Sequence, residues 1–229
     1  MDKVAIEKEA RRLQVEIYGQ RDVRYSMGAP DLPTLFDPRN VAEHCGLFHE
    51  ERDRLETDYR GGGEAAGLWQ RDRLTILVSR QFSYEVRRFT AGHEIGHFLL
   101  HPHIGDRTLH RELAVGTHTS RRPMLENDAD YFSACLLMPR NAVIKEFSAR
   151  FGGKHPLALT DTVAYHLKAD ERVLFAQPAG SLMFAEAVAK AAQFDRRHFR
   201  SLAQHFGVSV RAMAIRLDEL RLVASYLYA

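Results

Sequence analysis

The chain has 229 residues, of which 45% are hydrophobic, and this is enough to bury one substantial core with an appendage. A formal net charge of +2 gives no overall field that favours nucleic acid or a membrane, and two cysteines are too few for a disulfide framework. No leader-like N-terminus and no run of 18 uncharged apolar residues occur, so we expect a cytoplasmic protein without a membrane span.

The sequence pattern of residues 1–60 predicts helical segments that pack on a core. Residues 2–18 have the period of an amphipathic helix, with an apolar face formed by Val4 or Ile6, Ala10, Leu13 and Ile17. Asp37 followed by Pro38 is typical of a helix start, and a short helix should run to about Cys45. The three glycines at 61–63 lack the Lys-Ser/Thr of a phosphate loop and favour a turn between two strands.

A strand and a helix follow in the middle of the chain. Residues 74–78 are mostly apolar and lie between charged segments, which predicts a strand. The next helix should begin near Ser83 and end at about Leu100, because Pro102 cannot continue it. We expect the strand to be an edge strand beside a substrate cleft, where an extended peptide could add to the sheet.

The predicted helix carries His93, Glu94 and His97 as an H-E-x-x-H motif. Positions four apart share a helix face, so the two imidazoles can meet at one metal ion. Glu94 lies beside them, where a carboxylate could deprotonate a water molecule. Because the chain has 12 histidines, the motif alone can arise by chance, and the interpretation requires a third ligand.

Residues 101–123 show little periodicity and predict a loop that lies over or beside the metal. Its histidines are candidate ligands or transition-state donors, and Tyr131 is a further candidate donor. For any one of them, a solvated side chain without a catalytic role is the more common outcome. The loop histidines are His101, His103, His110 and His118.

Glu126 lies in the first turn of another predicted helix, which Pro139 ends. Two histidines and a glutamate form a known catalytic zinc set that leaves the fourth position open. The chain between His97 and Glu126 is long enough for a loop and a returning helix to bring the carboxylate to the metal. Asp130 follows one turn later on the same face and could accept the second ring N–H of a ligand histidine.

Residues 156–229 predict a helical region, in which 198–222 have the pattern of a helix, a tight turn and a second helix. Such a pair could bind DNA, and six arginines against two acids give residues 196–229 a local charge of +4. The second interpretation is packing on the catalytic domain through a stripe of Val210, Met213 or Ala214, Leu217 and Leu220. We prefer packing, because the start of the second helix offers few side chains for reading base edges.

Three stretches together resemble one protein family. They are Arg-Phe-Thr-Ala-Gly-His-Glu-Ile-Gly-His-Phe-Leu-Leu-His at 88–101, the pattern Glu126-x-x-Ala129-Asp130, and Leu-Ala-Gln-His-Phe-Gly-Val-Ser at 202–209. These stretches are similar to the ImmA/IrrE family of metallo-endopeptidases, which resemble compact gluzincins. The resemblance implies a mainly helical α+β fold with a zincin-like core at 61–155, in which a small sheet lies beside the H-E-x-x-H helix.

The resemblance also implies roles for individual residues. His93, His97 and Glu126 match the zinc ligands, and Glu94 matches the general base. Asp128 is the rival third ligand. Glu126 is preferred because its register with the following Ala-Asp matches the gluzincin pattern, and because Asp128 would rotate away if Asp130 faces the histidines. One Zn²⁺ per chain is expected, although such a site also accepts Mn²⁺ or another divalent ion.

The activity implied by the resemblance is cleavage of a regulatory protein, typically a helix-turn-helix transcriptional repressor or an antitoxin-like partner, during stress or mobile-element induction. The alternative is a regulatory module that captures such a partner without cleaving it, or that binds DNA through its C-terminal helices. Glu94 favours the enzyme, because a protein that only binds its partner needs no base beside two metal ligands.

Overall fold

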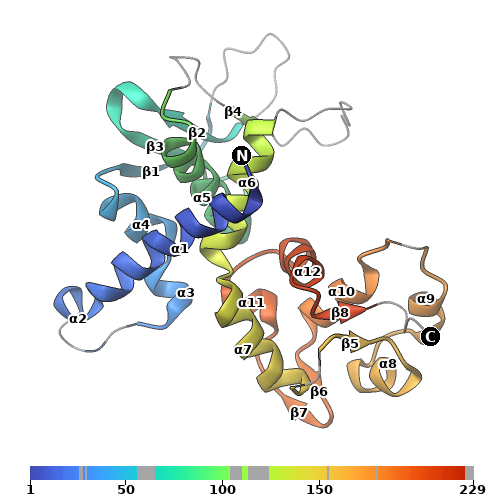
Figure 1. Cartoon of the computed structure of the whole chain (residues 1–229). Helices are drawn as coiled ribbons and strands as arrows, with labels where there is room; N and C mark the ends of the chain where they lie inside the picture. Colours follow the sequence, from blue (N-terminus) through green and yellow to red (C-terminus); the bar gives the residue numbers. More distant parts are fainter. Residues whose placement is uncertain are drawn as a thin grey trace. The chain divides into compact units, whose positions relative to one another are not determined.

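The computed structural model describes residues 1–25, 28, 30–55, 65–103, 110–112, 124–153, 155–178 and 180–224 (Figure 1). The chain divides into two compact units, Met1–Leu137 and Met138–Ala229. Both are mainly helical with small sheets, which agrees with the expected α+β class, although residues 156–229, expected to be a helical region, also contain short strands. In the described part of the chain, no helix is long and apolar enough to cross a membrane. This division does not test the expected domain boundaries at residues 60 and 155, and those boundaries stay a prediction.

The first unit contains a mixed sheet in the strand order β1-β3-β2-β4. Strand β1 runs parallel to β3, and the other neighbours are antiparallel. The bounds of the strands are Phe48–Arg52 for β1, Ala65–Gln70 for β2, Thr75–Ser79 for β3 and His110–Glu112 for β4. A short 3-10 turn, η1 (Arg71–Arg73), joins β2 to β3. The triple glycine at 61–63 lies outside the described residues.

The strand expected at 74–78 exists as β3, but its expected edge position is wrong. β3 pairs with β1 on one side and with β2 on the other, and all five of its residues are buried. An interior strand has its backbone hydrogen-bonding groups occupied on both sides, so a peptide cannot add to it. Within the described residues, the edges of this sheet are β1 and β4.

Helices pack on the sheet, and α5 contacts β2, β3, α4 and α6. Their bounds are Lys3–Gly19 for α1, Arg21–Arg24 for α2, Leu32–Leu35 for α3, Pro38–His44 for α4, Tyr84–Leu100 for α5 and Met124–Leu137 for α6. The predicted apolar face of α1 is buried through Ile6 rather than Val4. The side chains of Asp37 and Ser83 cap α4 and α5, which confirms both predicted helix starts.

Helices α5 and α6 pack closely because α5 presents glycine where they meet. A Cβ atom added at Gly92 would lie 2.6 Å from Ser133 Oγ, and one added at Gly96 would lie 3.1 Å from the Cα of Ala129. The two glycines are four residues apart and therefore share a helix face. This close approach outweighs the lower helix propensity of glycine, and it places the first turn of α6 beside the motif in α5.

The second unit contains short helices and two small sheets, in which β5 pairs with β8 and β6 with β7. The helices are α7 (Arg140–Phe151), α8 (Asp161–Leu167), α9 (Glu171–Phe175), α10 (Met183–Lys190), α11 (Leu202–Phe206) and α12 (Val210–Glu219). The strands are β5 (Leu157–Ala158), β6 (Gln193–Phe194), β7 (Arg197–His198) and β8 (Val223–Ala224).

The expected helix, turn and helix appear as α11, Gly207 and α12. Gly207 has a φ of 61°, a left-handed conformation that glycine adopts without strain, and the Ser209 side chain caps α12. Helix α12 packs on α10 and buries Met213, Ala214, Arg216 and Leu217. These contacts give the apolar stripe a structural role within its own unit, and DNA binding by this segment stays a prediction.

Candidate metal centre

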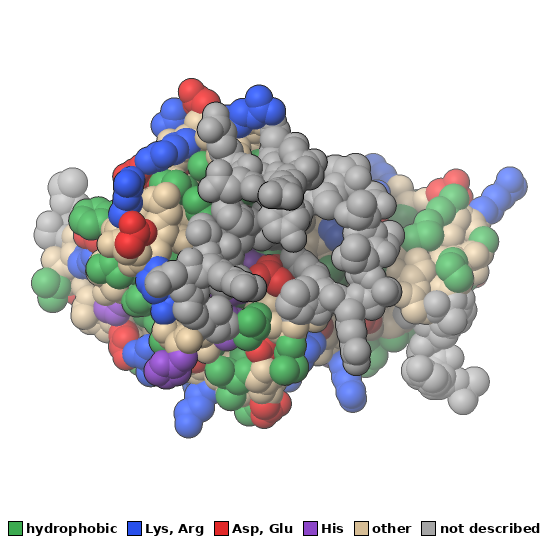
Figure 2. Space-filling view, turned by 90° about the horizontal axis from the view of Figure 1, so that it is seen from above, with side chains coloured by type: hydrophobic (Ala, Val, Ile, Leu, Met, Phe, Trp, Pro, Cys, Tyr) green, Lys and Arg blue, Asp and Glu red, His purple; other side chains and the backbone are tan. Residues whose placement is uncertain are grey.

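Three candidate ligands lie together where α5 meets α6. The Nε2 atoms of His93 and His97 are 2.9 Å apart, because the two residues are one helical turn apart. Glu126 in the first turn of α6 completes the group: its Oε2 atom lies 3.2 Å from His93 Nε2, and its Oε1 atom lies 3.2 Å from His97 Nε2. Both histidines are buried. Acidic and histidine side chains are visible near the middle of the face shown in Figure 2.

The chemistry and spacing of this group fit a zinc ion. Two imidazoles and a carboxylate are a common catalytic zinc set, and tetrahedral ligands bound at about 2.0–2.2 Å lie about 3.3–3.6 Å from one another. The observed separations of 2.9–3.2 Å between donor atoms are close to these distances between ligands. Among the described residues, three donors therefore converge on one point.

The electrostatics of the group favour a positive charge between the ligands. Burial opposes protonation of His93, but Asp130 and Glu126 outweigh this effect and raise the pKa of His93 from 6.5 to about 9. Burial also opposes ionisation of Glu126, yet the hydrogen bonds with His93 and His97 hold the pKa of its carboxyl well below the usual range. A metal cation can take the place of the proton that these residues share.

Glu94 is fully buried beside the ligands, and Gly67 in β2 makes room for it. A Cβ atom at Gly67 would overlap the methyl group of Thr90 and lie 3.1 Å from Glu94 Oε1. Sequence analysis did not single out Gly67. The sequence feature that indicates its role is a glycine inside an apolar strand, because such a glycine often marks a close approach of another group to the backbone.

Asp130 and Asp128 lie on different sides of the group. Asp130 Oδ1 is 2.7 Å from His93 Nδ1, the ring nitrogen that does not face the other ligands. Asp128 is absent from the described cluster of potential ligands. Its Oδ2 atom lies instead 2.5 Å from the amino group of Met1 and 3.8 Å from His101 Nε2. The geometry thus favours Glu126 over Asp128 as the third ligand.

The described candidates for a transition-state donor, His101, His103 and Tyr131, have different surroundings. His101 is buried, with its Nδ1 atom 3.1 Å from His97 Nδ1. Its pKa is lowered mainly by burial and to a lesser extent by the proximity of His97. His103 is exposed, and Tyr131 is partly buried beneath the Nζ atom of Lys3. The side chains of His110 and His118 lie outside the described residues, as does most of 101–123. A donor role for any of these residues stays a prediction.

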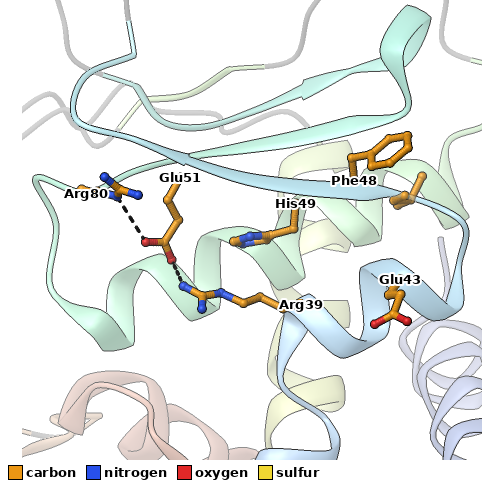
Figure 3. Close-up of a pocket in the computed structure, with 7 residues that line it drawn as sticks. Arg39, Glu43, Phe48, His49, Glu51 and Arg80 are labelled. Atoms are coloured by element: carbon orange, nitrogen blue, oxygen red, sulfur yellow. Dashed lines mark hydrogen bonds and ion pairs between the residues drawn. The ribbon is translucent and has the colours of Figure 1, made fainter. Parts of the chain in front are cut away.

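A separate hollow of about 460 Å³ lies between α4 and β1 (Figure 3). Glu51 forms ion pairs with Arg39, Arg80 and Arg87, the last at 2.7 Å. The lining consists of Arg39, Glu43, Leu47, Phe48, His49, Glu51 and Arg80. None of the candidate ligands is among these residues, so this hollow is distinct from the metal centre.

The model of one protein family matches residues 55–169, half of the chain. The family is that of the M78 peptidases, described as an IrrE N-terminal-like domain. The matched segment contains both α5 and α6, and therefore His93, Glu94, His97 and Glu126. No curated protein matches the chain. The match confirms the family resemblance found in the sequence.

Proposed function

Because the chain belongs to the M78 family of metallopeptidases, we propose that it is a zinc-dependent endopeptidase that cleaves a regulatory protein. The observation that carries this proposal is the convergence of His93 Nε2, His97 Nε2 and the Glu126 carboxylate, with buried Glu94 beside them. A cluster that serves only the fold needs no additional buried carboxylate beside the metal ligands.

His93, His97 and Glu126 would hold the ion. When bound, zinc supplies Lewis acidity, which polarises the scissile carbonyl and makes water more acidic. Glu94 removes a proton from the attacking water and later delivers it to the nitrogen of the leaving amine. Asp130 accepts the Nδ1–H of His93, which keeps that proton away from Nε2 and leaves Nε2 free to bind the ion.

The proposed substrate is a helix-turn-helix repressor or an antitoxin-like protein, cleaved in the cytoplasm under stress. Support comes from the resemblance to the ImmA/IrrE family in the motif helices and in residues 202–209. The alternative is a module that holds such a partner intact. It predicts a stable complex without fragments.

The test combines metal analysis with cleavage. Purified wild-type protein should contain about one zinc ion per chain, whereas Glu126→Ala should contain little, because two histidines alone hold zinc weakly. Both proteins are then incubated with candidate repressors, with and without a chelator, and new N-termini are identified by mass spectrometry. New termini should appear only with the wild-type protein and only without the chelator. Equal cleavage by Glu126→Ala, or cleavage that resists chelation, would contradict the proposal.

A further inference from the structure

The ring of His97 is held from both sides. Its Nε2 atom faces His93 and Glu126, and its Nδ1 atom lies 3.1 Å from His101 Nδ1. His101 directly follows α5 and is one turn after His97, and its backbone N–H donates to the carbonyl oxygen of His97. Only 6% of the His101 residue is exposed. A buried imidazole whose nitrogen faces another ring nitrogen is a defined contact rather than a solvated loop side chain.

Only one arrangement of protons at this contact serves a metal ligand. If Nε2 of neutral His97 binds an ion, its proton must be on Nδ1, and Nδ1 then needs an acceptor. His101 Nδ1 is the atom in the position of that acceptor. His101 must then carry its own proton on Nε2, and Asp128 Oδ2 lies 3.8 Å from that nitrogen. The carboxylate is too far away for a direct hydrogen bond but favours an N–H directed towards it.

We propose that His101 is a positioning residue, which fixes the ring of His97 as a metal ligand by accepting its Nδ1–H, and that Asp128 orients His101. The two ligand histidines thus have different supports, a carboxylate for His93 and an imidazole with a carboxylate behind it for His97. This inference rests on the proposed metal site. It gives His101 a function other than transition-state donation, and Asp128 a function other than zinc binding.

The test measures zinc affinity of the full-length protein by competition with a chromophoric chelator. His101→Leu removes the acceptor and should weaken zinc binding by about 10- to 100-fold, the usual effect of losing a partner behind a metal ligand. His101→Gln keeps an oxygen that can accept from Nδ1–H and should stay within about 3-fold of the wild type. His198→Leu removes an exposed histidine from β7 and should leave the affinity unchanged.

A nitrogen-15 NMR spectrum of the zinc-loaded wild type provides a readout that does not depend on any variant folding. The Nδ1–H of His97 should exchange slowly with solvent, since it is buried and hydrogen-bonded. Rapid exchange of this proton overturns the inference. Equal zinc affinity in the wild type and in a folded His101→Leu also overturns it and leaves the proposed function intact. Failure of the wild type to bind zinc overturns both.

Discussion

Helices α5 and α12 both bury ionisable side chains, but the surroundings of these side chains differ. In α12, the Nε of Arg216 donates to the carbonyl oxygen of Met138, and Glu219 lies 3.5 Å from its Nη1. The guanidinium is 1% exposed, and its charge has partners in its own unit. In α5, the Nε2 atoms of His93 and His97 face each other and a carboxylate.

The difference lies in what the buried atoms are directed at. The Nε and Nη1 atoms of Arg216 meet acceptors, so this charge is paired within its own unit. In α5, acceptors meet acceptors, and only a proton or a metal ion at their centre makes the arrangement favourable. Burial of charge alone therefore does not identify a binding site, whereas convergence of lone pairs does.

The largest expected effect comes from Glu94→Gln. It preserves the size of the side chain and removes the base, so peptide cleavage should fall by about 10²- to 10⁴-fold. Zinc content should remain at the wild-type level, because Glu94 is not among the three converging ligands. Single-turnover cleavage and metal analysis of the same preparation check both statements. An undiminished cleavage rate would remove Glu94 from the mechanism.

Arg216→Met tests the other helix. Methionine fills part of the space but leaves the Met138 carbonyl without its donor, and unfolding in urea should show a loss of about 3 kcal/mol. Arg211→Met is the matched control on α12, where an exposed pair with Glu186 is lost at a cost below about 1 kcal/mol. Zinc affinity of the folded protein should not change in either variant. Equal stability of the two variants would contradict a structural role for Arg216.

The α5 cluster should respond to pH in the neutral range. A proton on His93 stabilises the metal-free fold fully below its unfolded pKa of 6.5, and this stabilisation is lost as the pH rises through about 9. Zinc must displace that proton, so apparent zinc affinity should rise by about tenfold per pH unit from 6.5 towards 9. Isothermal titration calorimetry with zinc at several pH values measures this affinity. In Asp130→Asn the rise should end at a lower pH, and an identical profile would show that Asp130 does not raise the pKa of His93.

The smallest effect is expected where α5 touches α6. Gly96→Ala adds a methyl group 3.1 Å from the Cα of Ala129, and the resulting strain should exceed the gain in helix propensity by about 1 kcal/mol. Gly19→Ala is the control, because no atom lies within 4 Å of a Cβ at that helix end. Thermal unfolding should show a lower midpoint for Gly96→Ala alone. A raised midpoint in both variants would mean that α6 adjusts without cost.

Local features were predictable from the sequence because they depend on near neighbours. Asp37 and Ser83 cap helices through atoms two or three residues away, and the face of α1 follows from a period of 3.6 residues. The relative placement of His93 and His97 likewise needs only one helical turn. These predictions do not require knowledge of the tertiary fold.

The remaining features depend on segments that are distant in the chain. The position of β3 in the sheet is set by pairing with β1 and β2, and its hydrophobic pattern does not report which neighbours it has. Gly67 acquires its role only when β2 lies over Glu94. The contact of His101 with His97 depends on the way the chain leaves α5. Periodicity contains no information on any of these three contacts.

The glycines at 92 and 96 connect helix packing to the affinity for the metal. The two histidine ligands belong to α5 and the glutamate to α6, so the distance between the helices sets the size of the space that the three donors enclose. A shift of a few tenths of an ångström would move the donors away from the distances that zinc requires, which are defined to within about 0.2 Å. A substitution in the helix contact can therefore weaken metal binding while every ligand is retained.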